Sequence, residues 1–225
     1  SGNIVWSKTI GGSGWDIANS IIQSSDGGYV VAGSTQKFGV FGDNGDIYIV
    51  KLDSSGNVEW AKTISVIGYD EVGSIIQSSD GGYVVAGSTL TEIGYYNIYV
   101  VKLDSSGNVV WTKIIDGGNH DGASSIIQSS DGGYVVAGGT ASFGAGFGDM
   151  YVVKLDSSGN VVWTKTIGGS SNDWAVSIIQ SSDGGYVVAG STLSFGAGDQ
   201  DFYVVKLDSS GNIVWSKTIG GSGWD

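Results

Sequence analysis

Hydrophobic residues along this chain come in short runs, separated by turns rich in Gly, Asp, Ser and Asn. Four different runs follow one another, and then the series begins again. In the second series they are SIIQSS (residues 74–79), GYVVAGST (82–89), IYVVKLD (98–104) and NVVWTKII (108–115). Each run has the length of a β-strand and is rich in β-branched or aromatic residues. The pattern therefore predicts an all-β chain with four strands in each series.

The turns between the runs favour hairpins. The first two runs meet at SDGG, where Asp-Gly and Gly-Gly supply the positive φ of a tight hairpin. The last two meet at DSSGN, which suits a type I turn closed by a glycine bulge. Adjacent strands in each series are thus expected to pair antiparallel.

The series is an internal repeat. DGGYVVAG begins at Asp26, Asp80, Asp131 and Asp183, at intervals of 51 to 54 residues. The second strand, YVVAG, is apolar on both faces, so both of its faces must be covered by protein. Repeated four-stranded antiparallel sheets that are covered on both faces are typical of β-propeller blades. We expect a single β-propeller domain over residues 1–225, with repeats at about 17–70, 71–121, 122–173 and 174–225.

The first sixteen residues duplicate the last sixteen. SGNIVWSKTIGGSGWD spans residues 1–16 and again 210–225. Both copies have the pattern of a fourth, outer strand, and four blades need only one of them. Three interpretations remain: a window from a longer array, an engineered overlap, or a strand offered to a neighbouring chain. The third predicts head-to-tail assembly through Ile4, Trp6, Ile213 and Trp215.

Composition excludes several classes of function. The ten basic residues are all lysines, against 22 acids, and a net charge of −12 argues against a nucleic-acid partner. Without cysteine there is no disulfide framework and no thiolate nucleophile. No apolar run is long enough to span a membrane. We expect no cofactor, with calcium as the one candidate ion.

The motifs DGGYVVAGST and KLDSSGNVVWTKTIGG resemble the tandem β-propeller repeats of secreted and cell-surface proteins of bacteria and archaea. KLDSSGNVVW is also distantly similar to the tryptophan-docking motif of quinoprotein propellers, in which the tryptophan wedges between neighbouring blades. The resemblance implies a propeller at the cell surface or outside the cell. It does not extend to the quinone cofactor, because the chain has no arginine and no vicinal cysteines.

Two connections vary in sequence between the repeats, and in a propeller they share one rim. Loops on a rigid scaffold are common places for binding residues. Aromatic side chains and His120 on this rim suit stacking on a sugar or contact with a protein, although some rings could simply pack under their own loops. The candidate ligand-binding residues are Trp15, Phe38, Phe41, Tyr69, Tyr95, Tyr96, His120, Phe143, Phe147, Trp174 and Phe195.

One acidic position recurs just ahead of each first strand. If the chain binds a metal ion, Asp16, Asp70, Asp121 and Asp173, with Asp225, would form a carboxylate ring for calcium. The alternative, which we favour, is that each aspartate caps backbone amides in its own turn. The oxygens of DSSGN imitate the start of a calcium loop, but that loop's acidic twelfth ligand is missing.

Catalytic groups are scarce. His120, Asp121 and Ser124 are close in sequence, but neighbours in one loop rarely form a triad. Carboxylate pairs such as Asp199 with Asp201 would suit glycoside hydrolysis. We predict a propeller that is not an enzyme and serves as a scaffold for adhesion or assembly, with carbohydrate or calcium binding as the alternative and glycoside chemistry third.

Overall fold

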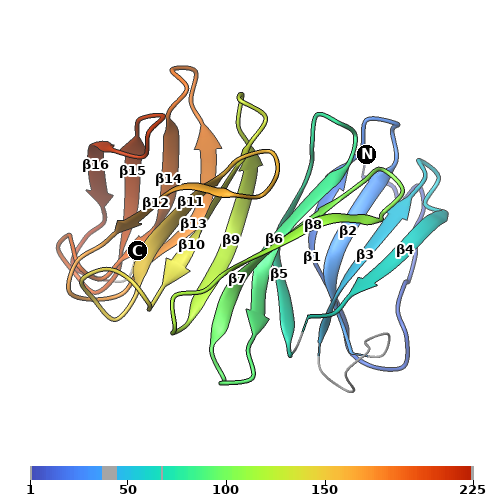
Figure 1. Ribbon diagram of the computed structural model, residues 1–225, viewed down its shortest axis with the longest axis horizontal. Helices are drawn as coiled ribbons and strands as arrows, with labels where there is room; N and C mark the ends of the chain where they lie inside the picture. Colours follow the sequence, from blue (N-terminus) through green and yellow to red (C-terminus); the bar gives the residue numbers. More distant parts are fainter. Residues whose placement is uncertain (1, 37–44, 67, 224–225) are drawn as a thin grey trace.

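The computed structural model describes residues 2–36, 45–66 and 68–223. Its strands form four antiparallel four-stranded sheets, each in chain order (Figure 1). The first blade contains β1 (Asp16–Gln23), β2 (Tyr29–Thr35), β3 (Asp46–Leu52) and β4 (Val58–Ile64), and the second contains β5 (Asp70–Gln77), β6 (Tyr83–Leu90), β7 (Tyr96–Leu103) and β8 (Val109–Ile115). The third contains β9 (Asp121–Gln128), β10 (Tyr134–Thr140), β11 (Asp149–Leu155) and β12 (Val161–Ile167), and the fourth contains β13 (Asp173–Gln180), β14 (Tyr186–Thr192), β15 (Asp201–Leu207) and β16 (Ile213–Ile219).

This architecture confirms the predicted fold class of four four-stranded antiparallel blades. Within the described ranges there is no helix long and apolar enough to cross a membrane. The innermost strands β1, β5, β9 and β13 pack against one another from blade to blade.

The two glycines of each DGG turn have different roles, which corrects the prediction that both supply a positive φ. Gly132 has φ +83°, whereas Gly133 lies outside the left-handed region. A Cβ on Gly133 would stand 2.3 Å from the carbonyl oxygen of Leu155 and 2.3 Å from Nζ of Lys154. The second glycine is therefore needed for close approach of the β11 backbone and of a lysine.

That lysine is buried in every blade. Lys154 is 4% exposed, and its Nζ lies 2.9 Å from Oδ1 of Asp131, the aspartate of the turn. Lys51, Lys102 and Lys206 make the same ion pair in the other blades. An almost fully buried ammonium group needs such a partner, so the lysine anchors the β9–β10 turn to β11.

The DSSGN turn forms as predicted. In the first blade, Gly56 has φ +82° and its N–H donates to the carbonyl oxygen of Asp53 at 3.1 Å. The Asp53 carboxylate accepts from the amides of Ser55 and Asn57 and from the Asn57 side chain. The β3–β4 register then shifts between Lys51 and Leu52, as a bulge requires. These bonds occupy both carboxylate oxygens of Asp53, the first residue of the segment that imitates a calcium loop.

A tryptophan connects each blade to the next, as the docking motif implied. Trp111 on β8 packs on Tyr134 of the third blade, with ring centroids 5.8 Å apart and planes at 57°. Trp60 and Trp163 make the equivalent contacts. The ring also covers the DSSGN turn of the following blade, because a Cβ on Gly159 would lie 2.8 Å from Trp111. Three apolar cores fill the three spaces between consecutive blades.

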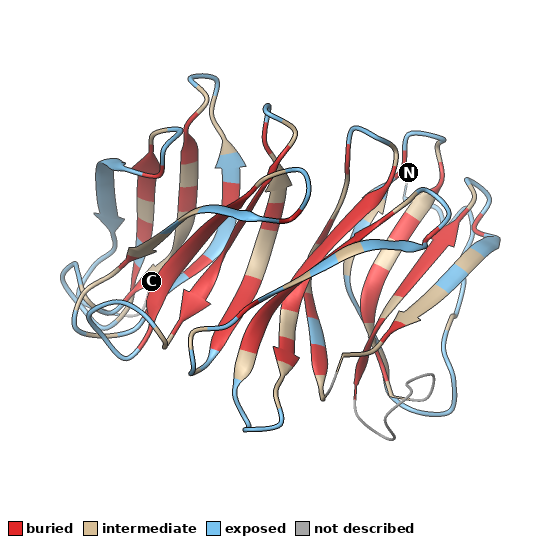
Figure 2. Ribbon diagram, in the orientation of Figure 1, coloured by how far each residue is buried: buried red, intermediate tan, exposed pale blue. Residues whose placement is uncertain are grey.

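The four blades form an open arc. The first and last blades lie at opposite ends of the longest axis, so neither covers the free face of the other (Figure 1). Burial follows this arrangement: every residue of β16 is exposed, whereas β11 is buried throughout (Figure 2).

The two copies of the duplicated segment adopt different structures. The C-terminal copy forms β16, which pairs with β15. Residues 2–15 of the N-terminal copy form no strand, although a fourth strand was predicted, because no third strand lies beside them to pair with. Trp6 is nevertheless docked: its ring lies 5.8 Å from Tyr29 at 57° and covers Gly56. Residues 2–10 thus place a tryptophan where a preceding blade would place its own.

Candidate functional site

Each innermost strand carries a β-bulge close to the rim with the variable loops. The register shifts leave Asn19, Gly73, Ser124 and Val176 without a partner in the neighbouring strand. Bulges redirect side chains and are frequent beside functional sites. In the third blade the bulge turns the Ser124 hydroxyl toward the fourth blade, where it accepts a hydrogen bond from the Trp174 indole at 3.0 Å.

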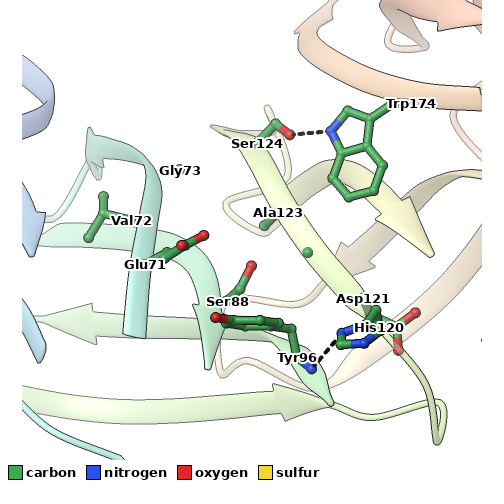
Figure 3. Close-up of a pocket in the computed structure, with 11 residues that line it drawn as sticks. Glu71, Val72, Gly73, Ser88, Tyr96, His120, Asp121, Ala123, Ser124 and Trp174 are labelled. Atoms are coloured by element: carbon green, nitrogen blue, oxygen red, sulfur yellow. Dashed lines mark hydrogen bonds between the residues drawn. The ribbon is translucent and has the colours of Figure 1, made fainter. Parts of the chain in front are cut away.

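A pocket of about 420 Å³ opens beside this bulge, where the second and third blades meet at the rim (Figure 3). Its walls come from β5, β9 and β13 and from Ser88, Tyr96 and His120. The volume lies within the range of small-molecule sites, roughly 300 to 1,000 Å³. This pocket is the strongest candidate for a binding site in the described part of the chain.

Trp174 forms one wall of the pocket and rests on two glycines. A Cβ on Gly139 would stand 2.1 Å from the indole, and one on Gly122 would be 3.6 Å away. The other blades have serine at the position of Gly139 and a larger residue at the position of Gly122. Only the third blade therefore leaves room for an indole here, and the ring remains 43% exposed.

His120 and two tyrosines form the opposite side. The Tyr96 amide donates to Nδ1 of His120 at 3.2 Å, so in the neutral ring the hydrogen belongs on Nε2. The Tyr95 ring meets His120 edge-on, with centroids 5.2 Å apart, and Tyr96 lies 5.8 Å from it. Burial, with a smaller effect of the Glu71 carboxylate, raises the pKa of the Tyr96 hydroxyl.

Two carboxylates line the pocket, and they differ in availability. Asp121 is buried, and its oxygens accept hydrogen bonds from Thr140 and Ser142. The Glu71 side chain is exposed, and its carboxylate forms no hydrogen bond to another described residue. Glu71 is therefore the free acceptor of the pocket. No lysine lines it.

The structure brings together some of the predicted rim residues and separates others. Tyr96, His120 and Trp174 line the pocket, and Tyr95 packs on His120. Trp15 and Tyr69 line a smaller cavity of about 130 Å³ in the first blade. Phe143 and Phe195 are half exposed and pack on Tyr151 and Tyr203, under their own loops. Phe147 is 83% exposed, and Phe38 and Phe41 lie outside the described residues.

Three of the four described recurring aspartates accept from backbone amides of the preceding loop, as in the interpretation we favoured, whereas Asp121 accepts from the hydroxyl groups of Thr140 and Ser142. Asp16, Asp70 and Asp173 each accept a hydrogen bond from a backbone amide four residues or so earlier. Asp225 lies outside the described residues. Among the residues described, no group of three or more acidic or histidine side chains is placed to hold a metal ion. Burial raises the pKa of Asp70 to about 6.

The candidate triad does not assemble. Ser124, His120 and Asp121 have separate partners, in Trp174, the Tyr96 amide and Thr140, so the three residues form no triad. Asp201 accepts a hydrogen bond from the Ala197 amide at 3.0 Å.

Sequence reasoning missed Glu71, Ser88 and the two glycines that support Trp174. The signal was present in the repeats: Gly122 and Gly139 are departures of the third repeat from the other three. The anchoring lysines were also missed, although each stands between a valine and a leucine of the third strand in every repeat.

Comparisons with known proteins agree with this fold. The model of the family described as "Domain of unknown function (DUF5122) beta-propeller" matches residues 181–213. No curated protein sequence matches the chain. The chain is a tandem-repeat β-propeller protein.

Several solved structures share the arrangement of blades. A protein named as an exo-β-1,3-galactanase from Bifidobacterium bifidum is similar at 15% identity and a TM-score of 0.51, over 92% of this chain and 74% of that one. A protein of unknown function from Dyadobacter fermentans is 13% identical with a TM-score of 0.55, over 90% of this chain and 65% of that one. A thermostable family-43 glycoside hydrolase is 10% identical with a TM-score of 0.51, over 96% and 75%. At such identities the likeness concerns the fold.

These structures correct one prediction. We had predicted from the propeller fold and from the scarcity of catalytic motifs that the chain is not an enzyme, and this prediction was wrong. Proteins with this arrangement of blades are named as a galactanase, a glycoside hydrolase and a puromycin hydrolase. The fold therefore gives no ground for excluding catalysis.

Proposed function

We propose that this propeller is an assembly module, in which the open face of the fourth blade packs on the first blade of a second copy of the chain. The proposal includes an extracellular or cell-surface setting, in line with the repeat resemblance. It rests on one observation. The chain makes the same blade-to-blade interface three times internally, and its two uncovered faces, on the fourth and the first blade, carry the two sides of that interface.

The first half belongs to the face that each blade turns toward the next. In the third blade this face presents Ala137, Met150, Val152 and Ile167, all buried against the fourth blade. The fourth blade repeats it with Ala189, Phe202, Val204 and Ile219, which nothing covers in the described structure. Phe202 and Ile219 are therefore 58% and 59% exposed. A contiguous apolar face of this kind is typical of an interaction surface.

The second half belongs to the receiving face. In the second blade Ile75, Tyr83, Val85 and Tyr99 are buried against the first blade. The first blade repeats these residues, and its Ile21 is 62% exposed. Part of this face lies under residues 6–10, with a groove of about 550 Å³ beneath them that reaches Val31 and Tyr48.

The duplicated sequence supplies the fit between the halves. Trp6 occupies the site formed by Tyr29 and Gly56. Trp215 stands at the corresponding position in the second copy of the duplicated sixteen-residue sequence, and it is 44% exposed on β16. A second copy can therefore present on β16 the side chain that the receiving site already holds. The contact is head-to-tail, so it either closes into a ring or grows into a filament.

The test is the molar mass in solution over a range of concentrations. We expect the 225-residue chain to associate and Phe202→Glu to be monomeric, because the substitution puts a charge into an apolar interface. Val110→Glu is the matched control, since Val110 is equally exposed on an internal outer strand. A chain that stays monomeric at every concentration would overturn the proposal, as would equal masses for the two variants.

A further inference from the structure

We propose that the pocket between Glu71, Tyr96, His120 and Trp174 is a binding site for a neutral carbohydrate of one or two sugar units. The site is independent of the assembly proposed above, because none of its residues lies on the open faces of the first and fourth blades. The argument rests on how the pocket departs from the chain's own repeat.

The four blades provide an internal comparison at the same place. Ile17, Glu71, Gly122 and Trp174 are equivalent second residues of the innermost strands. A structural position would keep one residue type, as the aspartate before it does in all four blades. Here the four side chains differ completely, so this position is free of the packing that fixes the rest of the repeat.

Trp174 is held as a rigid platform. Its ring is supported by Gly139, and its N–H is tied to Ser124 at 3.0 Å. With the nitrogen satisfied and the ring position fixed, the exposed part of the indole offers a flat apolar surface at little entropic cost. The C–H face of a pyranose ring matches such a surface.

The polar groups are arranged for hydroxyl groups. The Glu71 carboxylate is an acceptor without a partner, and Ser88 has a hydroxyl that both donates and accepts. His120 offers an Nε2–H donor, since its Nδ1 is occupied by the Tyr96 amide. In Figure 3, Glu71, Ser88 and Tyr96 lie together near His120, and Trp174 stands across the pocket with Ser124. A ligand between them would meet hydrogen-bonding groups at one end and an aromatic surface at the other.

The charges select a neutral ligand. No lysine lines the pocket, while Glu71 and Asp121 are both acidic, so a phosphate or carboxylate would be repelled. An amine would be attracted to Glu71, but a cation site surrounds the charge with several aromatic faces. In this pocket Tyr96 lies with Glu71 and Ser88 at one end and Trp174 lies at the other, so the aromatic faces do not surround one point (Figure 3). A neutral sugar uses both the platform and the hydroxyl partners.

The experiment is a titration of the full chain with neutral sugars, followed by intrinsic tryptophan fluorescence and by calorimetry. The probes are glucose, galactose, mannose, N-acetylglucosamine and their β-linked dimers. Choline and inorganic phosphate serve as cationic and anionic probes. We expect saturable binding of at least one neutral sugar. Binding of choline or phosphate with no response to any sugar would overturn the proposal.

Variants locate the site. Trp174→Ala should weaken binding by roughly tenfold or more, the effect of losing an aromatic contact worth about 1.4 kcal/mol. Trp15→Ala, at an exposed tryptophan outside the pocket, should bind as the parent does. If sugar binding is unchanged in Trp174→Ala, the pocket is not the site.

Two further variants keep the test valid should Trp174→Ala fold poorly. Gly139→Ser restores the residue of the other blades and brings a Cβ against the indole, so binding should fall. Glu71→Gln removes the free carboxylate, and Glu92→Gln, on an exposed loop, is its control. Sugar binding must also persist in the monomeric Phe202→Glu variant. This last result separates the site from the assembly, because either can fail without the other.

Discussion

The indole of Trp6 lies 5.8 Å from the ring of Tyr29, at an interplanar angle of 57°. Trp111 and Tyr134 repeat this geometry to the same distance and angle between the second and third blades. An irregular segment thus reproduces the contact of a strand. The docking site on the receiving blade, formed by a tyrosine and a glycine turn, is sufficient to position the ring.

Because Trp6 occupies a site that Trp215 of another copy would need, their replacement should have opposite effects. Trp6→Ala frees the site and should strengthen self-association, whereas Trp215→Ala removes the incoming ring and should weaken it. Sedimentation equilibrium of the two variants and the parent chain measures both effects. The competition is absent if both substitutions shift the association in the same direction.

The internal docking tryptophan should contribute strongly to stability. Trp111→Ala removes a ring that packs on Tyr134 and covers Gly159, and we expect a loss of about 3 kcal/mol in the free energy of unfolding. Chemical denaturation at low protein concentration measures it. Trp215→Ala, at the equivalent position of the last blade, is the control. It should cost less than about 1 kcal/mol, the usual range for exposed positions, and equal losses for both would contradict the docking role.

How much of this could be predicted from the sequence depends on what the repeats share. The strands, the DSSGN turn and the docking tryptophans recur in every repeat, so periodicity alone located them. The innermost strands begin earlier than predicted: in the second blade the strand begins at Asp70, four residues before Ser74. The repeat pattern did not reveal these first residues, because they differ between repeats and include a bulge. Glu71 was missed for the same reason, because its position holds a different residue in every repeat.

The pocket was only partly predictable for a related reason. Tyr96, His120 and Trp174 were recognised as aromatic or titratable residues on variable loops. Their convergence depends on Gly122 and Gly139, which matter through the space that they leave for the indole. Such space is a property of packing between blades and has no signature in the residue types of one repeat.

The two glycines of a DGG turn should tolerate alanine differently. Gly132→Ala places a Cβ in open space at φ +83°, so only backbone strain opposes it, at about 1 to 2 kcal/mol. Gly133→Ala drives a Cβ into the Leu155 carbonyl and Lys154. It should lower the free energy of unfolding by more than Gly132→Ala does, because the backbone and the ion pair must both move. Thermal unfolding of the two single variants compares them directly. A larger loss for Gly132→Ala would contradict the assigned roles.

Stability should depend on pH through Asp70, which is fully buried. Burial raises its pKa to about 6, above the ordinary value of 3.8, so the folded state holds the proton more tightly than the unfolded chain. The resulting stabilisation is complete below pH 4 and is lost as the pH rises through about 6. Asp70→Asn removes this loss, so its unfolding free energy relative to the parent should increase between pH 4.5 and pH 8. The whole effect is roughly 3 kcal/mol, since one unit of pKa corresponds to about 1.4 kcal/mol, and about 2 kcal/mol of it falls between pH 4.5 and pH 8. Denaturant titrations of both proteins at the two pH values measure it, and a difference that does not change with pH would show that the buried carboxyl group stays ionised throughout.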